Sequence, residues 1–276
     1  RAFRAPLRGG RTSPPGDIYF LRGKAGIEGY GMSDQPPVGP FDRDYFHSGP
    51  YANVSFARFS QYWWSNRYYA RLVRRHGPRQ GRALEVGCGL GHLLTWLADR
   101  YQVVGTDVNP WALEEARRNV PQGQFFQLSA QDMHPLEDAS FQIIVAKHVV
   151  EHLPEPDQAL GEFSRLLAPG GLLLLATPNL DSPMRPRKKE RWIGYQDPTH
   201  VSLRSPAEWL SGLRAVGLHP RRVCSDGFWD APYLPVIPAR LQKLIFGLPG
   251  GLQAVFGWSI LPLCMGESLI VLADKV

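Results

Sequence analysis

Residues 82–92 read R-A-L-E-V-G-C-G-L-G-H, and this stretch decides the fold. A short apolar run over residues 83–86 ends in three alternate glycines, Gly87, Gly89 and Gly91. Apolar residues then recur with helical spacing over residues 93–97. This order predicts a buried strand, a glycine turn and the start of a helix, the opening of a nucleotide-type site. Glycine suits such a turn because it adopts backbone angles that other residues resist and lets a ligand contact bare backbone.

An acidic residue ends the next predicted strand. Residues 103–107 read V-V-G-T-D, so Asp107 lies at the strand tip, where a carboxylate can accept both hydroxyl hydrogens of a ribose. Dinucleotide sites use G-x-G-x-x-G and place a helix N-terminus against a pyrophosphate. Here the third glycine comes one residue early, and Glu85 lies beside the turn. An acid in that position repels a pyrophosphate but attracts a cationic ligand.

The E-x-G-x-G-x-G run of residues 85–91 resembles motif I of the class I S-adenosylmethionine (SAM) dependent methyltransferases. SAM carries an ammonium and a sulfonium and no phosphate, so it suits an acidic turn. The resemblance implies a doubly wound, Rossmann-like α/β fold with a seven-stranded sheet whose last strand is antiparallel, and SAM as the cofactor. By the same resemblance, the cofactor contacts are Glu85, Gly87, Cys88, Gly89, Gly91, Asp107, Val108, Asp132, Met133 and Lys147. Asp132 is expected to accept a hydrogen bond from the adenine amine.

Bulk properties give little support to other classes. The net charge of +6 invites a nucleic-acid interpretation, but residues 1–31 carry +4 of it, so we expect no nucleic-acid partner. The three cysteines, Cys88, Cys224 and Cys264, lie far apart and form no C-x-x-C pair. Neither a disulfide framework nor a zinc knuckle is therefore indicated, and a cytoplasmic location is expected.

The chain divides into three parts by composition. Residues 1–40 are rich in Arg, Gly and Pro and are expected to be disordered or a non-native extension, with Met32 as the natural start. Residues 41–76 are aromatic and predict a helical cap, from which Tyr51, Tyr62 or Trp63 could line the site. Residues 77–276 form the predicted SAM-binding domain.

Residues 148–152, H-V-V-E-H, allow two interpretations. H-x-x-E-H is the zinc signature of inverted metallopeptidases, but it needs a continuous helix, which Pro154 and Pro156 would interrupt. The same letters resemble a segment of the type 11 methyltransferase group, which includes the quinone O-methyltransferases. There His148 could be a base, while Glu151 and His152 could bind the acceptor or a metal, or cap the next helix. Capping is the favoured single role for Glu151, and no metal is assigned.

A D-x-x-H segment, Asp197 to His200, also resembles these methyltransferases. We expect His200 to be the preferred general base, with Asp197 contacting the acceptor and influencing the orientation of His200. The basic insertion before it, residues 181–200, is either a solvated loop or a contact for an anionic acceptor.

An insertion of unusual character precedes the final strand. Residues 244–266 carry no charge and are numerous enough to span a bilayer, but prolines and glycines should break them into short pieces. We expect residues 227–266 to form an apolar lid over the acceptor pocket. Residues 240–266 could touch the inner face of a membrane, with Arg240 and Lys243 as the cationic edge.

Together these features predict a SAM-dependent methyltransferase. The expected reaction is O-methylation of a small-molecule, glycan or lipid-linked acceptor by in-line methyl transfer, assisted by a histidine base. The alternative is a catalytically silent SAM-fold protein that binds a partner or docks on a membrane. An NAD(P)-dependent oxidoreductase is disfavoured by the glycine spacing and by Glu85. The sequence makes no prediction of oligomeric state.

Overall fold

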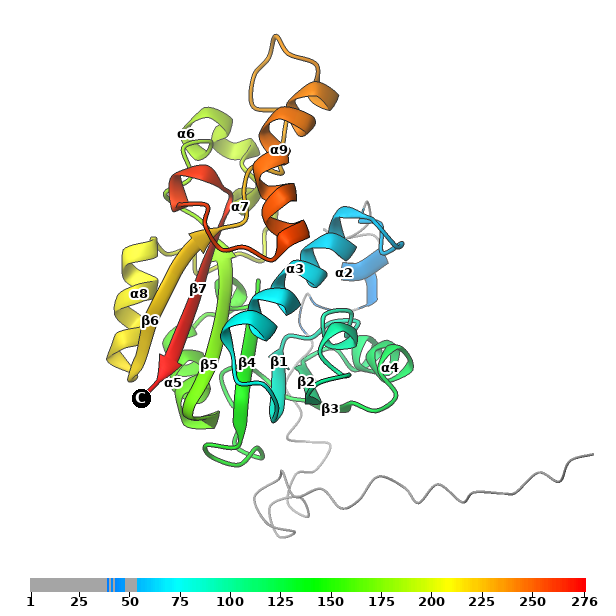
Figure 1. The fold of residues 1–276 in the computed structure, drawn as a ribbon, viewed down its shortest axis with the longest axis vertical. Coiled ribbons are helices and arrows are strands. Elements are labelled where there is room, and N and C mark those ends of the chain that lie inside the picture. The colour runs from blue at the N-terminus through cyan, green and yellow to red at the C-terminus, as the bar shows by residue number, and fades with distance from the viewer. Residues whose placement is uncertain (1–38, 40, 42, 48–53) are drawn as a thin grey trace, which may run out of the picture.

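Seven strands form one sheet in the computed structural model, which describes residues 39, 41, 43–47 and 54–276 (Figure 1). The strands are β1 (Arg82–Val86), β2 (Gln102–Asp107), β3 (Gln124–Gln127), β4 (Phe141–Lys147), β5 (Leu167–Pro178), β6 (Leu218–Ser225) and β7 (Ser268–Lys275). Their order is β3-β2-β1-β4-β5-β7-β6, and β7 runs antiparallel to both of its neighbours. The predicted fold class is confirmed.

Helices cover both faces of the sheet (Figure 1). The helices of the described residues are α2 (Arg43–His47), α3 (Gln61–His76), α4 (Pro110–Asn119), α5 (Pro156–Leu166), α6 (Arg185–Lys188), α7 (Ile193–Gln196), α8 (Pro206–Ala215) and α9 (Ala239–Phe256). Strand residues alternate between two buried clusters, because successive side chains point to opposite faces. In β4, Ile144 packs in the cluster that includes α5 and α8, while Ile143 packs in the cluster that includes α3 and α4. Burial on both faces explains why the strands read as apolar runs.

The sheet order creates a crevice between β1 and β4. From β1 the chain proceeds to β2 and β3 on one side, and then returns across the sheet to β4 on the other side. In open α/β sheets, ligands bind at such a switch point, outside the carboxyl ends of the strands. The glycine turn follows β1 and His148 follows β4, so both lie at this edge.

Helix α3 occupies the position predicted for the aromatic cap. The Ser60 side chain accepts a hydrogen bond from the backbone of Trp63 at the start, and Gly77 is the C-cap. Helix α9, nearly two hundred residues later, lies beside α3 (Figure 1). The Arg71 guanidinium donates to the Val255 carbonyl and Arg75 donates to that of Gly257, at 3.4 Å. The cap and the late insertion therefore cover the crevice together.

The prediction of a helix directly after the glycine turn is wrong. Residues 94–96 form only a 3-10 turn, η2 (Leu94–Trp96), and the chain reaches β2 through further turns. Its backbone bonds join Trp96 to Leu93 and Leu97 to Leu94, each at 3.0 Å. This tighter winding buries the leucines in a segment too short for a full helix before β2 begins.

The expectation that residues 244–266 break into short pieces is wrong for residues 244–256 and holds after Gly257, where only a 3-10 turn, η5 (Leu263–Met265), follows. Helix α9 continues through Pro249, although an interior proline costs about 3 kcal/mol. Two buried glutamines hold its ends. Gln242 bonds to the backbone of Tyr233, Leu234 and Ile237, and Gln253 bonds to that of Ser225, Ile260 and Leu261. Tertiary hydrogen bonds thus override the local helix breaker.

Two expectations concern parts of the chain that are largely or wholly outside the described residues. The predicted N-terminal extension, residues 1–40, is described only at Gly39, and Tyr51 lies in the gap at 48–53. Across the described ranges, no helix is both long and apolar enough to cross a membrane.

Candidate functional site

A cleft of about 1120 Å³ opens at the carboxyl ends of β1 and β4. Its floor is the glycine turn and the segment after β4, and its walls include residues of α3 and α9. Of the predicted site residues, those that line the cleft are Tyr62, Glu85, Gly87, Cys88, Gly89, Asp107, Val108, Lys147, His148 and His152. Residues from the sequence-predicted turn, cap and insertion therefore meet around one space, as ligand sites usually require.

The glycine turn has the backbone conformation that only glycine adopts readily. Gly87 has φ 64° and Gly91 has φ 73°. A Cβ atom at Gly87 would lie 2.5 Å from the Val149 side chain, so no other residue fits there. Gly91 lies behind the turn, where an added Cβ would touch Ala116 at 3.1 Å. The turn thus exposes backbone to the cleft while packing tightly beneath it.

Asp107 is fixed by backbone donors on both sides. Its Oδ2 accepts from the Gly89 amide at 2.8 Å and its Oδ1 from the Asn109 amide at 2.9 Å. Burial raises the pKa of this carboxyl above its ordinary value, and the amide donors oppose that rise. A carboxylate has about four acceptor positions, so Asp107 keeps capacity for ligand hydroxyls.

Glu85 and Lys147 bring an acidic and a basic side chain to the cleft. Glu85 is 5% exposed, and its Oε2 has no hydrogen-bond partner within the described part of the chain. Burial raises the pKa of Glu85 to about 8, an effect that the ammonium of Lys147 opposes. Burial lowers the pKa of Lys147 to about 8. An orphaned buried carboxylate is costly, so this group fits a cationic ligand.

Lys147 lies in a cage that sequence reasoning missed. Its Nζ donates to Asn66 Oδ1 at 2.7 Å and lies 5.1 Å from the ring centroids of Tyr62 and Tyr69. Asn66 is 2% exposed. A single buried amide within an otherwise aromatic helix was the available sequence signal. The cage holds the ammonium at the cleft, where it could meet a ligand carboxylate.

His148 and Glu151 form a hydrogen-bonded pair beyond β4. The Nδ1 of His148 lies 3.0 Å from Glu151 Oε1, and His148 has φ 53°, an unusual value for a residue other than glycine. Glu151 is fully buried. Burial alone would raise the pKa of Glu151, but the hydrogen bond and charge of His148 outweigh it and lower that pKa.

The helix-capping role expected for Glu151 is wrong. Glu151 lies in the 3-10 turn η3 (Val150–His152), and helix α5 starts at Pro156 with Glu155 as its N-cap residue. The Glu151 carboxylate instead faces His148, because the short turn directs it inward.

The Asp197 carboxylate is linked through Thr199 to His152, while the Asp197 carbonyl accepts from the His200 backbone amide at 3.2 Å. Thr199 Oγ1 donates to Asp197 Oδ1 at 2.5 Å and accepts from His152 Nδ1 at 2.8 Å, while Tyr45 donates to Asp197 Oδ2 at 3.0 Å. His200 Nδ1 donates to the Gly194 carbonyl at 2.7 Å. The expected orientation of His200 by Asp197 is replaced by this backbone contact.

Several predicted site residues lie away from the described lining of the cleft. Asp132 has a side chain that is 68% exposed and bonds to His134 at 2.9 Å, while Met133 is buried in the core. Trp63 packs on Trp96, with ring centroids 5.1 Å apart. Glu151, Asp197 and His200 are not among the described lining residues, although Glu151 bonds to His148 and His200 lies beside His152. In the 181–200 insertion, Lys188 forms an ion pair with Asp230 and is not among the described residues that line the cleft.

Asp226 is a further cleft residue that the sequence analysis did not select. It follows β6 and accepts from Trp229 Nε1 at 2.8 Å and from Ser268 Oγ at 2.7 Å. Burial raises its pKa. An acid directly after a predicted strand was a usable signal, as it was for Asp107.

Comparison with known proteins places the chain in a family. The methyltransferase domain family matches residues 57–222. The "probable S-adenosylmethionine-dependent methyltransferase" of Mycolicibacterium smegmatis is 33% identical over 135 residues, 45% of this chain and 51% of that protein. A trans-aconitate 2-methyltransferase of Variovorax paradoxus is 29% identical over 149 residues, 53% of this chain and 52% of that protein. The chain therefore spans about half the length of these curated relatives.

The solved structures show the same architecture. A TehB-like SAM-dependent methyltransferase of Corynebacterium glutamicum superposes with a TM-score of 0.52 at 19% identity, covering 76% of this chain and 88% of that one. The type 11 subgroup stays a prediction. The glycine turn, the two buried acids and these matches agree: the chain belongs to the methyltransferase domain family, among the class I methyltransferases, and SAM is its cofactor.

Proposed function

We propose that this protein transfers a methyl group from SAM to an oxygen atom of an acceptor bound in the same cleft. The proposal rests on the observation that the predicted cofactor residues and a histidine line one continuous cleft. One cleft of about 1120 Å³ is lined both by Glu85 and Asp107 and by His148. Pockets for one ligand usually have about 300–1,000 Å³, so this volume suits a cofactor with a second molecule beside it.

The acidic residues fit the cofactor by charge. Asp107 would accept from the ribose hydroxyls, the unpartnered Oε2 of Glu85 would meet the ammonium, and Lys147 would meet the carboxylate. SAM, when bound, supplies a methyl group on a positively charged sulfur leaving group. The protein then needs mainly to align the acceptor and to exclude water.

His148 is the base that the geometry favours. It lines the cleft, whereas His200 is absent from the described lining. Glu151 accepts from His148 Nδ1, which leaves the lone pair on Nε2 and orients the ring. With SAM bound, the acceptor oxygen would take the methyl group, and the sulfur would leave with both electrons of the carbon–sulfur bond. The hydroxyl proton passes to His148.

Helix α9 suggests an acceptor with an apolar body. Leu248, Leu252 and Val255 line the cleft although they are 54%, 45% and 39% exposed. An acceptor lying along them would remove these side chains from water. A lipid or a lipid-linked glycan has the required combination of an apolar chain and a reactive hydroxyl.

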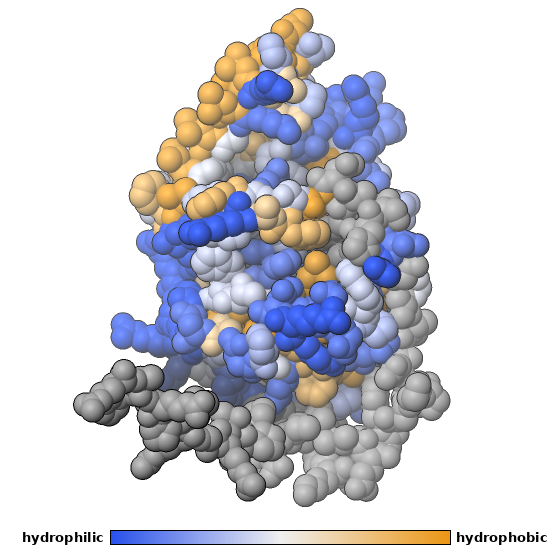
Figure 2. Space-filling model, turned by 90° about the vertical axis from the view of Figure 1, so that its right-hand side faces the viewer, coloured by the Kyte–Doolittle hydropathy of each residue, from blue (hydrophilic) through white to orange (hydrophobic). Residues whose placement is uncertain are grey.

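The outer surface of α9 favours contact with a membrane. We define the α9 band as the exposed apolar residues of α9 outside the cleft lining, which are Leu241, Leu244, Ile245 and Phe256. Hydrophobic residues gather at the end of the molecule where α9 lies (Figure 2). Residues 231–266 contain no acid, and Arg240 and Lys243 are exposed beside the band. An apolar strip with cationic neighbours suits an anionic lipid surface.

The test is methyl transfer from radiolabelled SAM to a panel of hydroxylated apolar molecules, including lipid-linked sugars, alongside calorimetric titration with SAM. SAM binding together with labelling of an acceptor hydroxyl is expected. SAM binding without labelling of any acceptor would favour a silent SAM-binding protein. A folded protein without affinity for SAM would overturn the proposal.

A further inference from the structure

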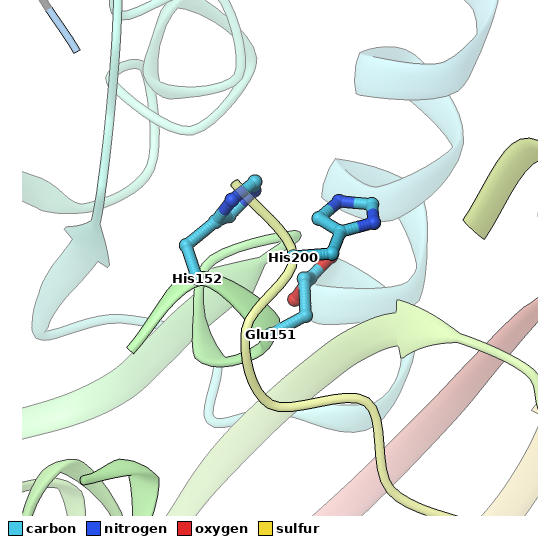
Figure 3. Close-up of side chains that lie close together, drawn as sticks. All are labelled: Glu151, His152 and His200. Carbon is cyan, nitrogen blue, oxygen red and sulfur yellow. The ribbon is translucent and has the colours of Figure 1, made fainter. Parts of the chain in front are cut away.

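Three side chains with metal-binding atoms meet behind the wall of the cleft. Glu151 and His152 belong to η3, and His200 comes from the loop before α8, nearly fifty residues later (Figure 3). One ligand atom from each lies within 4.8 Å of the others. The rings of His152 and His200 have centroids 4.7 Å apart. This cluster has no part in the proposed cofactor contacts.

Both histidines are held by their Nδ1 atoms. The Thr199 carbonyl and hydroxyl accept from His152 Nδ1, at 3.3 and 2.8 Å, and the Gly194 carbonyl accepts from His200 Nδ1, at 2.7 Å. Carbonyl oxygen can only accept, so each Nδ1 carries the hydrogen. Each neutral ring therefore keeps a lone pair on Nε2. Such outer hydrogen bonds fix the tautomer and ring orientation of histidines that ligate metals.

Glu151 supplies an independent observation. It is fully buried, Oε1 is bonded to His148, and Oε2 has no partner in the described ranges of the chain. A buried carboxylate oxygen without a partner is costly, and a cation beside it would remove that cost.

We infer that Glu151, His152 and His200 form a site for a divalent transition-metal ion, best suited to Zn²⁺. Two imidazoles and one carboxylate are a common set for zinc sites that keep an open position. Zn²⁺ binds histidine nitrogen at about 2.0–2.1 Å, so the three side chains would close slightly around the ion. The site revises the expectation that no metal is bound.

This site differs from the zinc signature considered for residues 148–152. There, both histidines would ligate from one helix, whereas His148 here bonds to Glu151 through Nδ1 and has left-handed backbone. His200, distant in sequence, replaces it. His152 also lines the cleft, so an open position on the ion would face the acceptor space. Binding an acceptor oxygen there is a role that rests on the proposed function.

The test uses the full chain, stripped with a chelator and titrated with Zn²⁺ against a chromophoric indicator. One Zn²⁺ per chain is expected, and a single Co²⁺ should give visible absorption bands. His200→Ala and Glu151→Gln should each weaken Zn²⁺ binding at least 100-fold. Thr199→Val removes the hydroxyl that holds His152 and should weaken Zn²⁺ binding by about 10–100-fold. The matched control is His134→Ala, which removes an exposed histidine outside the site and should not change Zn²⁺ binding.

Each preparation is also titrated with SAM and checked by circular dichroism, so loss of the fold is separated from loss of a ligand. Wild-type protein that binds SAM but not Zn²⁺ would overturn the metal site and leave the proposed function standing. Undiminished Zn²⁺ binding by folded His200→Ala would overturn the assignment of ligands. Binding of Mg²⁺ in preference to Zn²⁺ would overturn the class of metal.

Discussion

Two buried glutamates in this molecule have opposite electrostatic surroundings. Glu85 belongs to the cofactor wall, which we define as the carboxyl ends of β1 and β2, and Glu151 belongs to the acceptor wall, formed by η3, His148 and α9. Each leaves one carboxylate oxygen without a partner among the described residues. Burial raises the pKa of Glu85, with Asp107 adding to the rise, while His148 lowers that of Glu151.

The difference shows how burial alone does not determine the charge of a site. Glu85 has a fellow acid and one amine nearby, so its negative charge forms fully only when a cationic ligand arrives. Glu151 accepts a hydrogen bond from His148 and has His152 and His200 nearby, and these contacts lower its pKa. The cofactor wall is therefore suited to an organic cation, and the acceptor wall to proton transfer and a metal ion.

The largest expected effect lies in the acceptor wall. His148→Ala should lower the rate of methyl transfer by about 10²–10⁴-fold, the usual contribution of a positioned base. SAM affinity should change little, because the acids of the cofactor wall remain. Single-turnover kinetics with calorimetry measures both. A loss of SAM affinity as large as the loss of rate would show that the two walls are not separate.

Asp107→Ala should weaken SAM binding by about 100-fold. Hydrogen bonds to a charged group contribute about 1.5–3 kcal/mol each, and the variant also loses the bond from Gly89. Asp132→Ala is the matched control, since that carboxylate is exposed and bonds to His134. Titration calorimetry compares the two. Equal losses in both variants would restore the adenine contact predicted for Asp132.

The pH dependence of SAM binding should follow Glu85. Its pKa of about 8 without ligand means that Glu85 is mostly protonated at pH 7, whereas the ammonium of SAM favours the ionised form. Binding below pH 8 must therefore release a proton, and affinity should fall by up to about tenfold per pH unit from pH 8 to 6. Calorimetry in buffers of different ionisation enthalpy counts this proton. Glu85→Gln should bind SAM more weakly, and its SAM affinity should no longer depend on pH. If the affinity of this variant still falls with pH, the proton belongs to another group.

The smallest expected effect concerns the α9 band. Leu244→Glu and Ile245→Glu should each weaken binding to anionic phosphatidylglycerol vesicles by about tenfold, because each removes apolar area and adds a repelled charge. Val276→Glu adds the same charge at an exposed apolar residue far along the chain and is the control. Vesicle co-sedimentation gives the partition constants. If the wild-type protein and all three variants bind the vesicles equally, the proposed contact between α9 and a membrane is wrong.

The sequence by itself determined the cofactor wall. The turn needs glycine because Gly87 and Gly91 have positive φ, and the strand tip brings Asp107 to the amide of Gly89 across a single parallel pairing of β1 with β2. Local side chains also hold two helix starts: Asn109 caps α4, and Ser205 with Glu208 forms a capping box on α8. Such features depend on backbone angles and on contacts between neighbours, so they can be read directly from residue order.

Only the tertiary structure decided the acceptor wall and the position of Lys147 beside the cofactor wall. The bond of Lys147 to Asn66 joins residues 81 positions apart, and that of His152 to Thr199 joins residues 47 positions apart. No local pattern encodes these pairs, because they arise when α3 and the loop before α8 pack against the sheet. The same reason explains the two wrong predictions of secondary structure. Residues 94–96 form a 3-10 turn with buried leucines, and α9 continues through Pro249 because Gln242 and Gln253 bond to distant backbone. Packing between distant segments outweighed local propensity in both places.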